Sequence, residues 1–116
     1  MSKKNETLKE TFFEALESYK KKDFKNAQIL CYKILSIDAY HFESISLLAT
    51  LSAMQGNFSE SIDFLKKALE IKPKDLSALH NLATAYQELG KFENSINLYQ
   101  EVLKIDSKHI NAHYNL

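Results

Sequence analysis

Two histidines near the C-terminus have the spacing of a metal-binding pair. His109 and His113 are four residues apart, which on a helix can turn two imidazoles toward one metal ion. No cysteine or carboxylate at ligand spacing joins them, and Ile110 stands where the helix of a zinc protease carries its glutamate. We therefore interpret both as surface histidines, and we predict no metal site and no cofactor.

The single cysteine is the other residue with reactive chemistry. Cys31 shares a helical stripe with Phe24, Ala27 and Ile34, and no cationic residue lies on that face to favour the thiolate. We expect a buried, inert thiol. One cysteine also excludes an internal disulfide framework and fits a reducing compartment.

Signatures of catalysis and of nucleic-acid binding are missing from the sequence. It has no glycine-rich phosphate loop, no nucleophile elbow and no paired acid site, so we predict that the chain is not an enzyme. Fifteen lysines, without any arginine, balance fifteen acidic residues, which removes the basic footprint of a nucleic-acid-binding protein. We interpret the run Lys20-Lys21-Lys22 as a solvated turn at the C-terminal end of a helix, where lysines favour the helix dipole.

The composition favours an all-α domain. The 116 residues are 45% apolar and 26% charged, which is typical of a globular chain. Two glycines and one proline are too few for the frequent turns of an all-β fold. No apolar run approaches the ~18 residues of a membrane span, and no secretory signal stands at the start. We expect a cytoplasmic protein with no membrane partner.

An internal repeat organises the chain. When the sequence is shifted by 34 residues, its apolar positions fall on themselves. The aligned sets are Phe24, Phe58 and Phe92; Ala15, Ala49 and Ala83; Leu35, Leu69 and Leu103; and Ile37, Ile71 and Ile105. The units run over about 8–41, 42–75 and 76–109, and 110–116 begins a fourth.

Each unit has the periodicity of two helices. In the third unit, Leu79, Leu82, Ala83, Tyr86 and Leu89 recur at three- and four-residue spacing, so we predict one buried face. Glycine can end such a helix in the left-handed conformation, and Gly90 follows the stripe as Gly56 does in the second unit.

Residues that can cap the start of a helix support the same division of each unit into two helices. Asp23 is a candidate cap for the second helix of the first unit, and Asn57 with Glu60 has the spacing of a capping box. Lys22 stands where the other units have glycine, so that turn carries strain of about 1 kcal/mol. A single helix pair cannot bury its own apolar faces, and each pair must stack on its neighbours.

The units resemble the tetratricopeptide repeat (TPR). Positions of the TPR pattern are occupied by Leu79, Leu82, Ala83, Tyr86, Ser95, Tyr99 and Ser107 in the third unit, by Ile45, Leu48, Ala49, Ser52, Ser61, Leu65 and Pro73 in the second, and by Thr11, Glu14, Ala15, Ser18, Ala27, Cys31 and Ala39 in the first. The resemblance covers nearly the whole chain. It implies one domain over 1–116, an all-α TPR-type solenoid of stacked antiparallel helix pairs with about six helices and a truncated seventh.

The last seven residues match the start of the third unit. Ile110 to Leu116 repeats the pattern of Leu76 to Leu82 and stops after about two turns. One interpretation is that the natural protein continues and this chain is a fragment. The alternative is a short cap whose apolar edge, with Ile110, Ala112 and Leu116, favours self-association.

The resemblance also implies a concave groove, lined by the first helix of each unit, that accepts an extended peptide of a partner protein. The predicted groove residues are Lys9, Phe12, Phe13, Leu16, Tyr19, Glu43, Ser46, Leu47, Thr50, Met54, Ser77, His80, Asn81, Thr84, Gln87, Glu88, Asn111, Tyr114 and Asn115. The set runs from apolar to amide-rich, which favours an apolar ligand anchor near Phe12 and Phe13. Asn81 and Asn115 can each donate to and accept from a peptide backbone. The alternative is a solvated polar helix face.

Two functional hypotheses follow. The first is an interaction module without catalysis; the second is a substrate-presenting or oligomerising arm of a larger transferase, of glycosyltransferase or sulfotransferase type. Lysine without arginine is typical of AT-rich codon usage and favours a bacterial source.

Chaperone-binding TPR domains hold a C-terminal carboxylate with a clamp of Lys, Asn and Arg. The matching places here are Phe12, Leu16, Leu47, Ser77 and Asn81, so we expect no binding of heat-shock chaperone tails.

Overall fold

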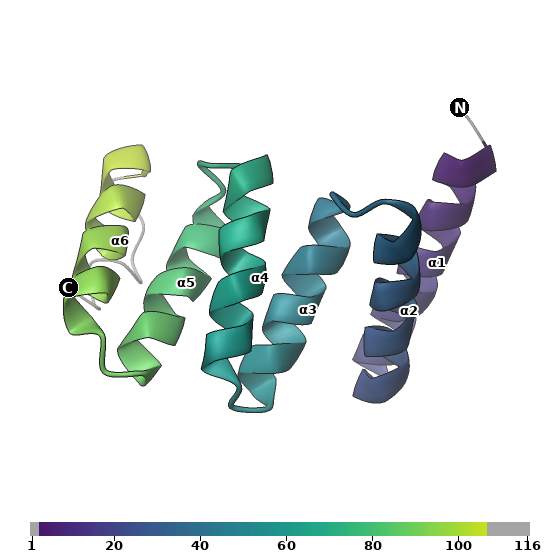
Figure 1. Cartoon of the computed structure of the whole chain (residues 1–116), viewed down its shortest axis with the longest axis horizontal. Coiled ribbons are helices and arrows are strands. Elements are labelled where there is room, and N and C mark those ends of the chain that lie inside the picture. The colour runs from purple at the N-terminus through teal and green to yellow at the C-terminus, as the bar shows by residue number, and fades with distance from the viewer. Residues whose placement is uncertain (1–2, 107–116) are drawn as a thin grey trace.

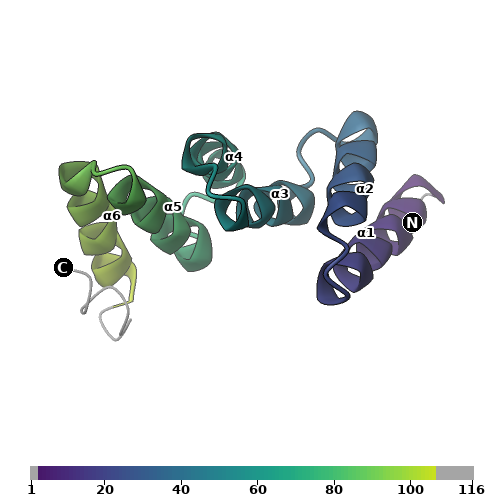
Figure 2. The ribbon, with the colours of Figure 1, turned by 90° about the horizontal axis from the view of Figure 1, so that it is seen from below.

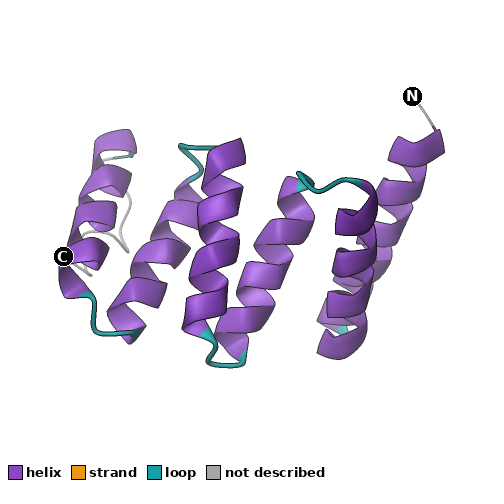
Figure 3. Ribbon diagram, in the orientation of Figure 1, coloured by secondary structure: helices purple, strands orange, loops and turns teal. Residues whose placement is uncertain are grey.

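The computed structural model describes residues 3–106 and, within them, six helices and no strand (Figures 1 and 3). The helices are α1 (Lys3–Lys20), α2 (Phe24–Ile37), α3 (Phe42–Met54), α4 (Phe58–Ile71), α5 (Leu76–Glu88) and α6 (Phe92–Ile105). The all-α prediction is confirmed for this part of the chain. The predicted truncated seventh helix falls on 110–116, outside the described residues.

Side-chain caps set where several of the helices begin. Asp23 accepts a hydrogen bond from the backbone N–H of Asn26 at 3.2 Å, and Asp75 accepts one from that of Ala78 at 2.9 Å. Each bond satisfies a helix N–H that has no partner within its helix. The predicted cap at Asp23 is therefore confirmed.

The predicted capping box is present in part. Asn57 accepts from the backbone N–H of Glu60, as expected. The Glu60 carboxylate accepts instead from the Ser52 hydroxyl at 2.8 Å and from the Asn57 side-chain amide at 3.1 Å. It thereby ties the end of α3 to the start of α4, rather than returning to the backbone as the standard box does.

Left-handed residues turn the chain between the helices of each pair. Gly56 and Gly90 have φ angles of 77° and 76°, and Lys22 takes the same region at 66°. The prediction that Lys22 stands in a glycine place is confirmed. Because a side chain meets its own backbone in this region, Lys22 is the strained member of the three.

The helices form a row with α1 and α6 at its two ends (Figure 1). Consecutive helices pack on one another, and α2 and α4 lie on one side of the row while α1 and α3 lie on the other (Figure 2). The radius of gyration is 15.0 Å, against about 13 Å for a compact domain of this length. The elongation follows from stacking pairs in one direction, which is the solenoid that the repeat predicts.

Apolar clusters form both between neighbouring pairs and within one pair. Leu82 and Tyr86 pack with Ala49, Ile62 and Leu65 of the preceding pair, as do the small residues of α5. On the other side of the same helix, Leu79 and Ala83 pack with residues of α6. The buried stripe on α5 therefore serves two interfaces, and only half of it packs within its own pair.

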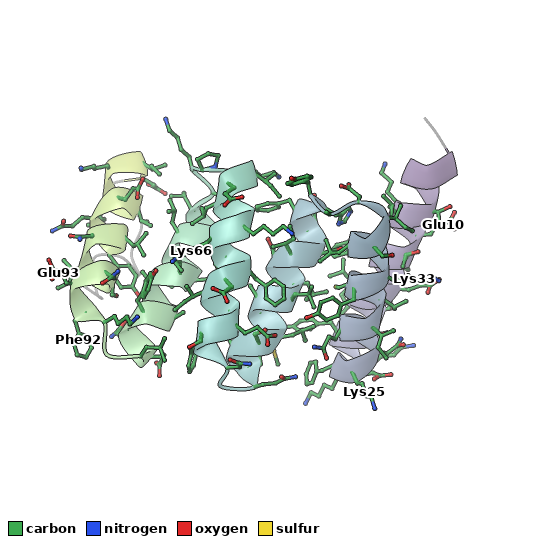
Figure 4. All side chains as sticks on the ribbon, in the orientation of Figure 1. Glu10, Lys25, Lys33, Lys66, Phe92 and Glu93 are labelled. Atoms are coloured by element: carbon green, nitrogen blue, oxygen red, sulfur yellow. The ribbon has the colours of Figure 1, made fainter. Side chains whose placement is uncertain are left out.

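Exposed apolar residues mark the C-terminal end of the row. Phe92 is 61% exposed and Ile96 is 41% exposed, whereas Ile62, one repeat earlier, is 7% exposed. Phe92 and Glu93 project from the start of α6 at the edge of the molecule (Figure 4). The apolar edge predicted over 110–116 lies outside the described residues.

Candidate functional site

Two adjoining hollows lie on the face formed mainly by α1, α3 and α5. We name them the Phe12 pocket and the Ala53 pocket. The Phe12 pocket, of about 320 Å³, is lined by Phe12, Leu16, Phe42, Glu43, Ser46, Leu47, Thr50, Leu65, Asp75, Ser77, Ala78 and Asn81. The Ala53 pocket, of about 280 Å³, is lined by Ala49, Thr50, Ala53, Met54, Phe58, Ser61, Leu65, Asn81, Thr84 and Ala85. Thr50, Leu65 and Asn81 line both, so the two hollows adjoin one another, and we call the pair the groove.

The Ala53 pocket presents an apolar interior although four polar residues line it. The hydroxyl of Ser61 donates to the Ala49 carbonyl at 2.9 Å. Those of Thr50 and Thr84 donate to the carbonyls four residues earlier in their own helices, at 3.2 and 3.1 Å. These donors are committed to the fold, and the pocket offers carbon atoms to a ligand.

Asn81 is a polar residue of the groove whose side chain is available to a ligand. Its side chain is exposed on α5, and it makes no hydrogen bond to any residue within 3–106. An asparagine amide can donate to a carbonyl and accept from an N–H, which are the two groups of a peptide bond. Asn81 stands where the two pockets meet, so a backbone that crosses the groove passes this amide.

Charges gather at the Phe12 end. Both charged residues that line the Phe12 pocket, Glu43 and Asp75, are carboxylates. Lys72 places its Nζ 4.3 Å from the centroid of the Phe42 ring, and His41 Nε2 lies 3.8 Å from a Glu43 carboxylate oxygen. The His41 ring also lies 5.5 Å from that of Phe12, a residue that lines this pocket.

The pockets bring together ten of the predicted groove residues. These are Phe12, Leu16, Glu43, Ser46, Leu47, Thr50, Met54, Ser77, Asn81 and Thr84. Lys9, Phe13, Tyr19, His80, Gln87 and Glu88 line neither pocket. Asn111, Tyr114 and Asn115 lie outside the described residues.

Of the residues that line neither pocket, one is exposed to solvent and two make aromatic contacts. Phe13 is 63% exposed to solvent. The Tyr19 ring packs on Phe24 with 5.7 Å between centroids, and the His80 ring meets the edge of Tyr99 at 5.5 Å. Tyr19 and His80 therefore contribute to packing between the two helices of their own pairs.

The small residues that open the Ala53 pocket were not among the predicted groove residues. Ala53 and Ala85 line it, and one repeat earlier the corresponding places hold Tyr19 and Leu51. A comparison of side-chain size between aligned repeats would have found the site. Helical periodicity alone does not, because alanine fits an apolar stripe as well as leucine does.

The described part of the chain offers little other chemistry. Within residues 3–106, no group of three or more His, Cys, Asp or Glu residues lies close enough together to hold a metal ion. Burial raises the pKa of the Cys31 thiol from 9.0 to about 11, against a smaller lowering by its hydrogen bond with Ser44. The thiol is fully buried, as predicted. None of the helices over these residues is both long enough and apolar enough to cross a membrane.

The chain is similar in sequence to one protein family and in structure to several solved proteins. A family model described as Tetratricopeptide repeat matches residues 42–108. No curated protein matches the sequence. Among solved structures, the O-GlcNAc transferase of Thermobaculum terrenum has a TM-score of 0.86 and 23% identity, over 97% of this chain and 22% of that one.

Two further structures show the same likeness. The first TPR of Spaghetti (RPAP3), solved with an HSP90 peptide, has a TM-score of 0.87 and 16% identity, over 94% of this chain and 86% of that one. MamA has a TM-score of 0.88 and 21% identity, over 97% of this chain and 61% of that one. The chain thus spans about a fifth of the transferase and three fifths of MamA. At these identities the likeness concerns the fold.

Proposed function

Because the chain belongs to the tetratricopeptide repeat family, we propose that it is a protein-interaction module that binds an extended peptide of a partner protein along the Phe12 and Ala53 pockets. The fold supports a role as an interaction scaffold. The observation that carries the finer proposal is the position of Asn81, exposed at the junction of the two pockets with an amide that nothing in residues 3–106 engages. The three units over 8–41, 42–75 and 76–109 supply the binding surface.

The chemistry of the groove argues against acidic chaperone tails as the ligand. The Spaghetti structure holds an HSP90 peptide, SRMEEVD, which ends in acidic residues. In this chain Glu43 and Asp75 line the groove, and like charges repel such a tail. The places of the carboxylate clamp hold Phe12, Leu16, Leu47, Ser77 and Asn81. The proposed ligand is therefore an internal, extended segment rather than a C-terminal carboxylate.

A selection from random peptides tests the proposal. A phage-displayed heptapeptide library is selected on the immobilised chain, and the enriched peptides are synthesised with a fluorescent label for anisotropy titration. We expect Asn81→Ala to weaken their binding by about fivefold, because one or two backbone hydrogen bonds are lost. Asn97→Ala is the matched control, since Asn97 is exposed on α6 and lines neither pocket.

The outcomes of that selection either support or contradict binding in the groove. Enriched peptides that respond to Asn81→Ala and not to Asn97→Ala support groove binding. A library without enrichment contradicts the proposal, as do peptides that bind both variants with unchanged affinity. Asn115→Ala, measured in the same way, tests whether a second asparagine one repeat later also reads the backbone.

The second candidate function places the same groove in a larger transferase. The observation in its favour is that 97% of this chain superposes on a segment of the Thermobaculum terrenum O-GlcNAc transferase. In that arrangement the groove presents an acceptor protein to a catalytic domain elsewhere. The mass of the native protein in its source distinguishes the two functions. A mass near 13.4 kDa leaves no room for a catalytic domain, and a much larger mass favours the arm.

A further inference from the structure

Four residues that line the Ala53 pocket are smaller or more polar than their counterparts one repeat earlier. Residues 34 apart occupy corresponding places in successive units, so the junction of the first and second units can be compared with that of the second and third. Large apolar residues of the first junction, Leu16, Tyr19, Leu47 and Leu51, correspond to Thr50, Ala53, Asn81 and Ala85 in the second. All four replacements remove apolar volume or add polarity.

In the first junction, side chains of the chain itself fill the place that corresponds to the Ala53 pocket. Tyr19 packs on Phe24 with 5.7 Å between ring centroids and 58° between ring planes. Leu16, Leu47 and Leu51 belong to the same apolar cluster as those two rings. A tyrosine from the chain itself therefore occupies the place that corresponds to the Ala53 pocket.

The second junction has a ring that corresponds to Phe24 but no ring that corresponds to Tyr19. Phe58 corresponds to Phe24 and lines the pocket, while Ala53 corresponds to Tyr19. The cavity left there measures about 280 Å³. An apolar cavity of about 150 Å³ already takes benzene, so this one has room for an aromatic side chain.

We infer that the Ala53 pocket binds an aromatic side chain of the peptide ligand, packed on Phe58 as Tyr19 packs on Phe24. The inference rests on the proposed function, since it names the residue class that the groove selects. Ring pairs at such tilted geometry attract one another beyond the effect of the area that they bury. Met54, at the pocket lip and 52% exposed, adds a flexible thioether that contacts aromatic rings favourably.

The rest of the lining disfavours charged side chains. No charged residue lines the pocket, and its hydroxyls donate within the fold, so a charged side chain would lose its hydration without a partner. Asn81 stands at the rim, where the first junction has Leu47. An aromatic residue seated in the pocket thus has a backbone partner for its own peptide group.

The test introduces into the second junction the tyrosine that fills the corresponding place in the first. Ala53→Tyr places a tyrosine opposite Phe58, and the control Ala39→Tyr makes the same change in an exposed turn. The probes are N-acetyl-phenylalanine amide and N-acetyl-alanine amide, titrated into the ¹⁵N-labelled chain. Chemical shifts of Ala53, Asn81 and Ala85 report occupancy of the pocket, and thermal unfolding followed by circular dichroism confirms that each variant is folded.

We expect the phenylalanine probe to bind at the pocket about tenfold more tightly than the alanine probe, in the millimolar range typical of small fragments. Ala53→Tyr should weaken it by about tenfold because the pocket is filled from within, and Ala39→Tyr should leave it unchanged. Should Ala53→Tyr not fold, Ala85→Leu restores another first-junction residue and makes the same prediction. Equal binding of the two probes would overturn the inference, as would unchanged binding to a folded Ala53→Tyr.

The peptide selection separates failure of this inference from failure of the proposed function. Enriched peptides that contain an aromatic residue and lose affinity with Ala53→Tyr support both. Enriched peptides without an aromatic residue, indifferent to Ala53→Tyr but weakened by Asn81→Ala, overturn the aromatic pocket and leave groove binding standing. A library without enrichment contradicts groove binding, while the amide probes still report on the pocket itself.

Discussion

The hydroxyl oxygens of Thr84 and Tyr99 lie 3.0 Å apart and join the groove face of α5 to the centre of α6. Thr84 lines the Ala53 pocket, whereas Tyr99 is fully buried in the core of the third pair. Because Thr84 donates to the His80 carbonyl, the single Tyr99 proton is shared between two acceptors, the Thr84 oxygen and Gln87 Oε1 at 3.4 Å. A single buried phenol therefore supports the wall of the proposed binding site from behind.

Removal of that phenol should loosen the third pair. Tyr99→Phe keeps the ring and deletes the hydroxyl, which leaves Thr84 and Gln87 without this partner. We expect the free energy of unfolding to fall by about 1 kcal/mol, the usual worth of such hydrogen bonds. Urea unfolding of the variant measures it, with Tyr32→Phe as the control because Tyr32 is 45% exposed. Equal stability of both variants would show that the hydroxyl contributes nothing.

A substitution in the turn at Lys22 should increase the stability of the protein. Lys22 has a φ of 66° where the two later turns use Gly56 and Gly90. We expect Lys22→Gly to raise the free energy of unfolding by up to about 1 kcal/mol, because the side chain no longer strains a left-handed residue. Thermal unfolding measures the change.

Two further variants isolate the backbone effect of that turn. Lys21→Gly, next in the chain but without a positive φ, should only lose stability, since glycine adds freedom to the unfolded chain. Gly56→Ala should cost about 1 kcal/mol through the backbone alone, because no atom lies within 4 Å of the added Cβ. A Lys22→Gly variant no more stable than Lys21→Gly would contradict the strain.

Local signals explain why so much of the fold follows from the sequence. The helix starts depend on residues such as Asp23 and Asn57, whose side chains cap within three residues of their own positions. The turns at Gly56 and Gly90 depend on one backbone conformation each. Periodicity and spacing capture such features because cause and effect are neighbours in the chain.

The candidate site follows less directly because it depends on size across a junction. Phe12 and Phe13 are adjacent and alike in type, yet Phe12 lines a pocket and Phe13 is 63% exposed. Ala53 and Ala85 line one cavity from helices of different pairs. A helical pattern identifies the face on which a residue lies, but not whether the facing unit fills the space beside it.

The cap of α3 differs from that of α5, and an aspartate should replace it in function. His41 accepts from the backbone N–H of Ser44 through Nδ1 at 3.2 Å, where the next unit uses Asp75. We expect His41→Ala to cost about 1 kcal/mol at neutral pH, the usual loss when a capping side chain is removed. His41→Asp should recover most of it, since aspartate is a strong N-cap. Urea unfolding checks the pair, and equal stabilities of the two variants would mean that the cap is not what His41 contributes.

The buried thiol makes stability depend on alkaline pH. Burial raises the pKa of Cys31 from 9.0 to about 11, so the unfolded chain loses this proton at lower pH than the folded one. The contribution of the protonated thiol is complete below pH 9 and is lost as the pH rises toward 11. At a pH midway between these values the loss is about 1 kcal/mol, since one pKa unit corresponds to about 1.4 kcal/mol.

Lysines and tyrosines titrate in the same range, so the measurement must isolate Cys31. Urea unfolding of the wild type and of Cys31→Ala is compared at pH 7.5, where the difference reflects packing, and again near pH 10. We expect the difference in free energy of unfolding to shrink by about 1 kcal/mol, because only the wild type loses the thiol contribution. A thiol reagent at pH 8 should react with the unfolded chain and spare the folded one. A difference that stays constant with pH, or rapid labelling of the folded protein, would contradict the burial of Cys31.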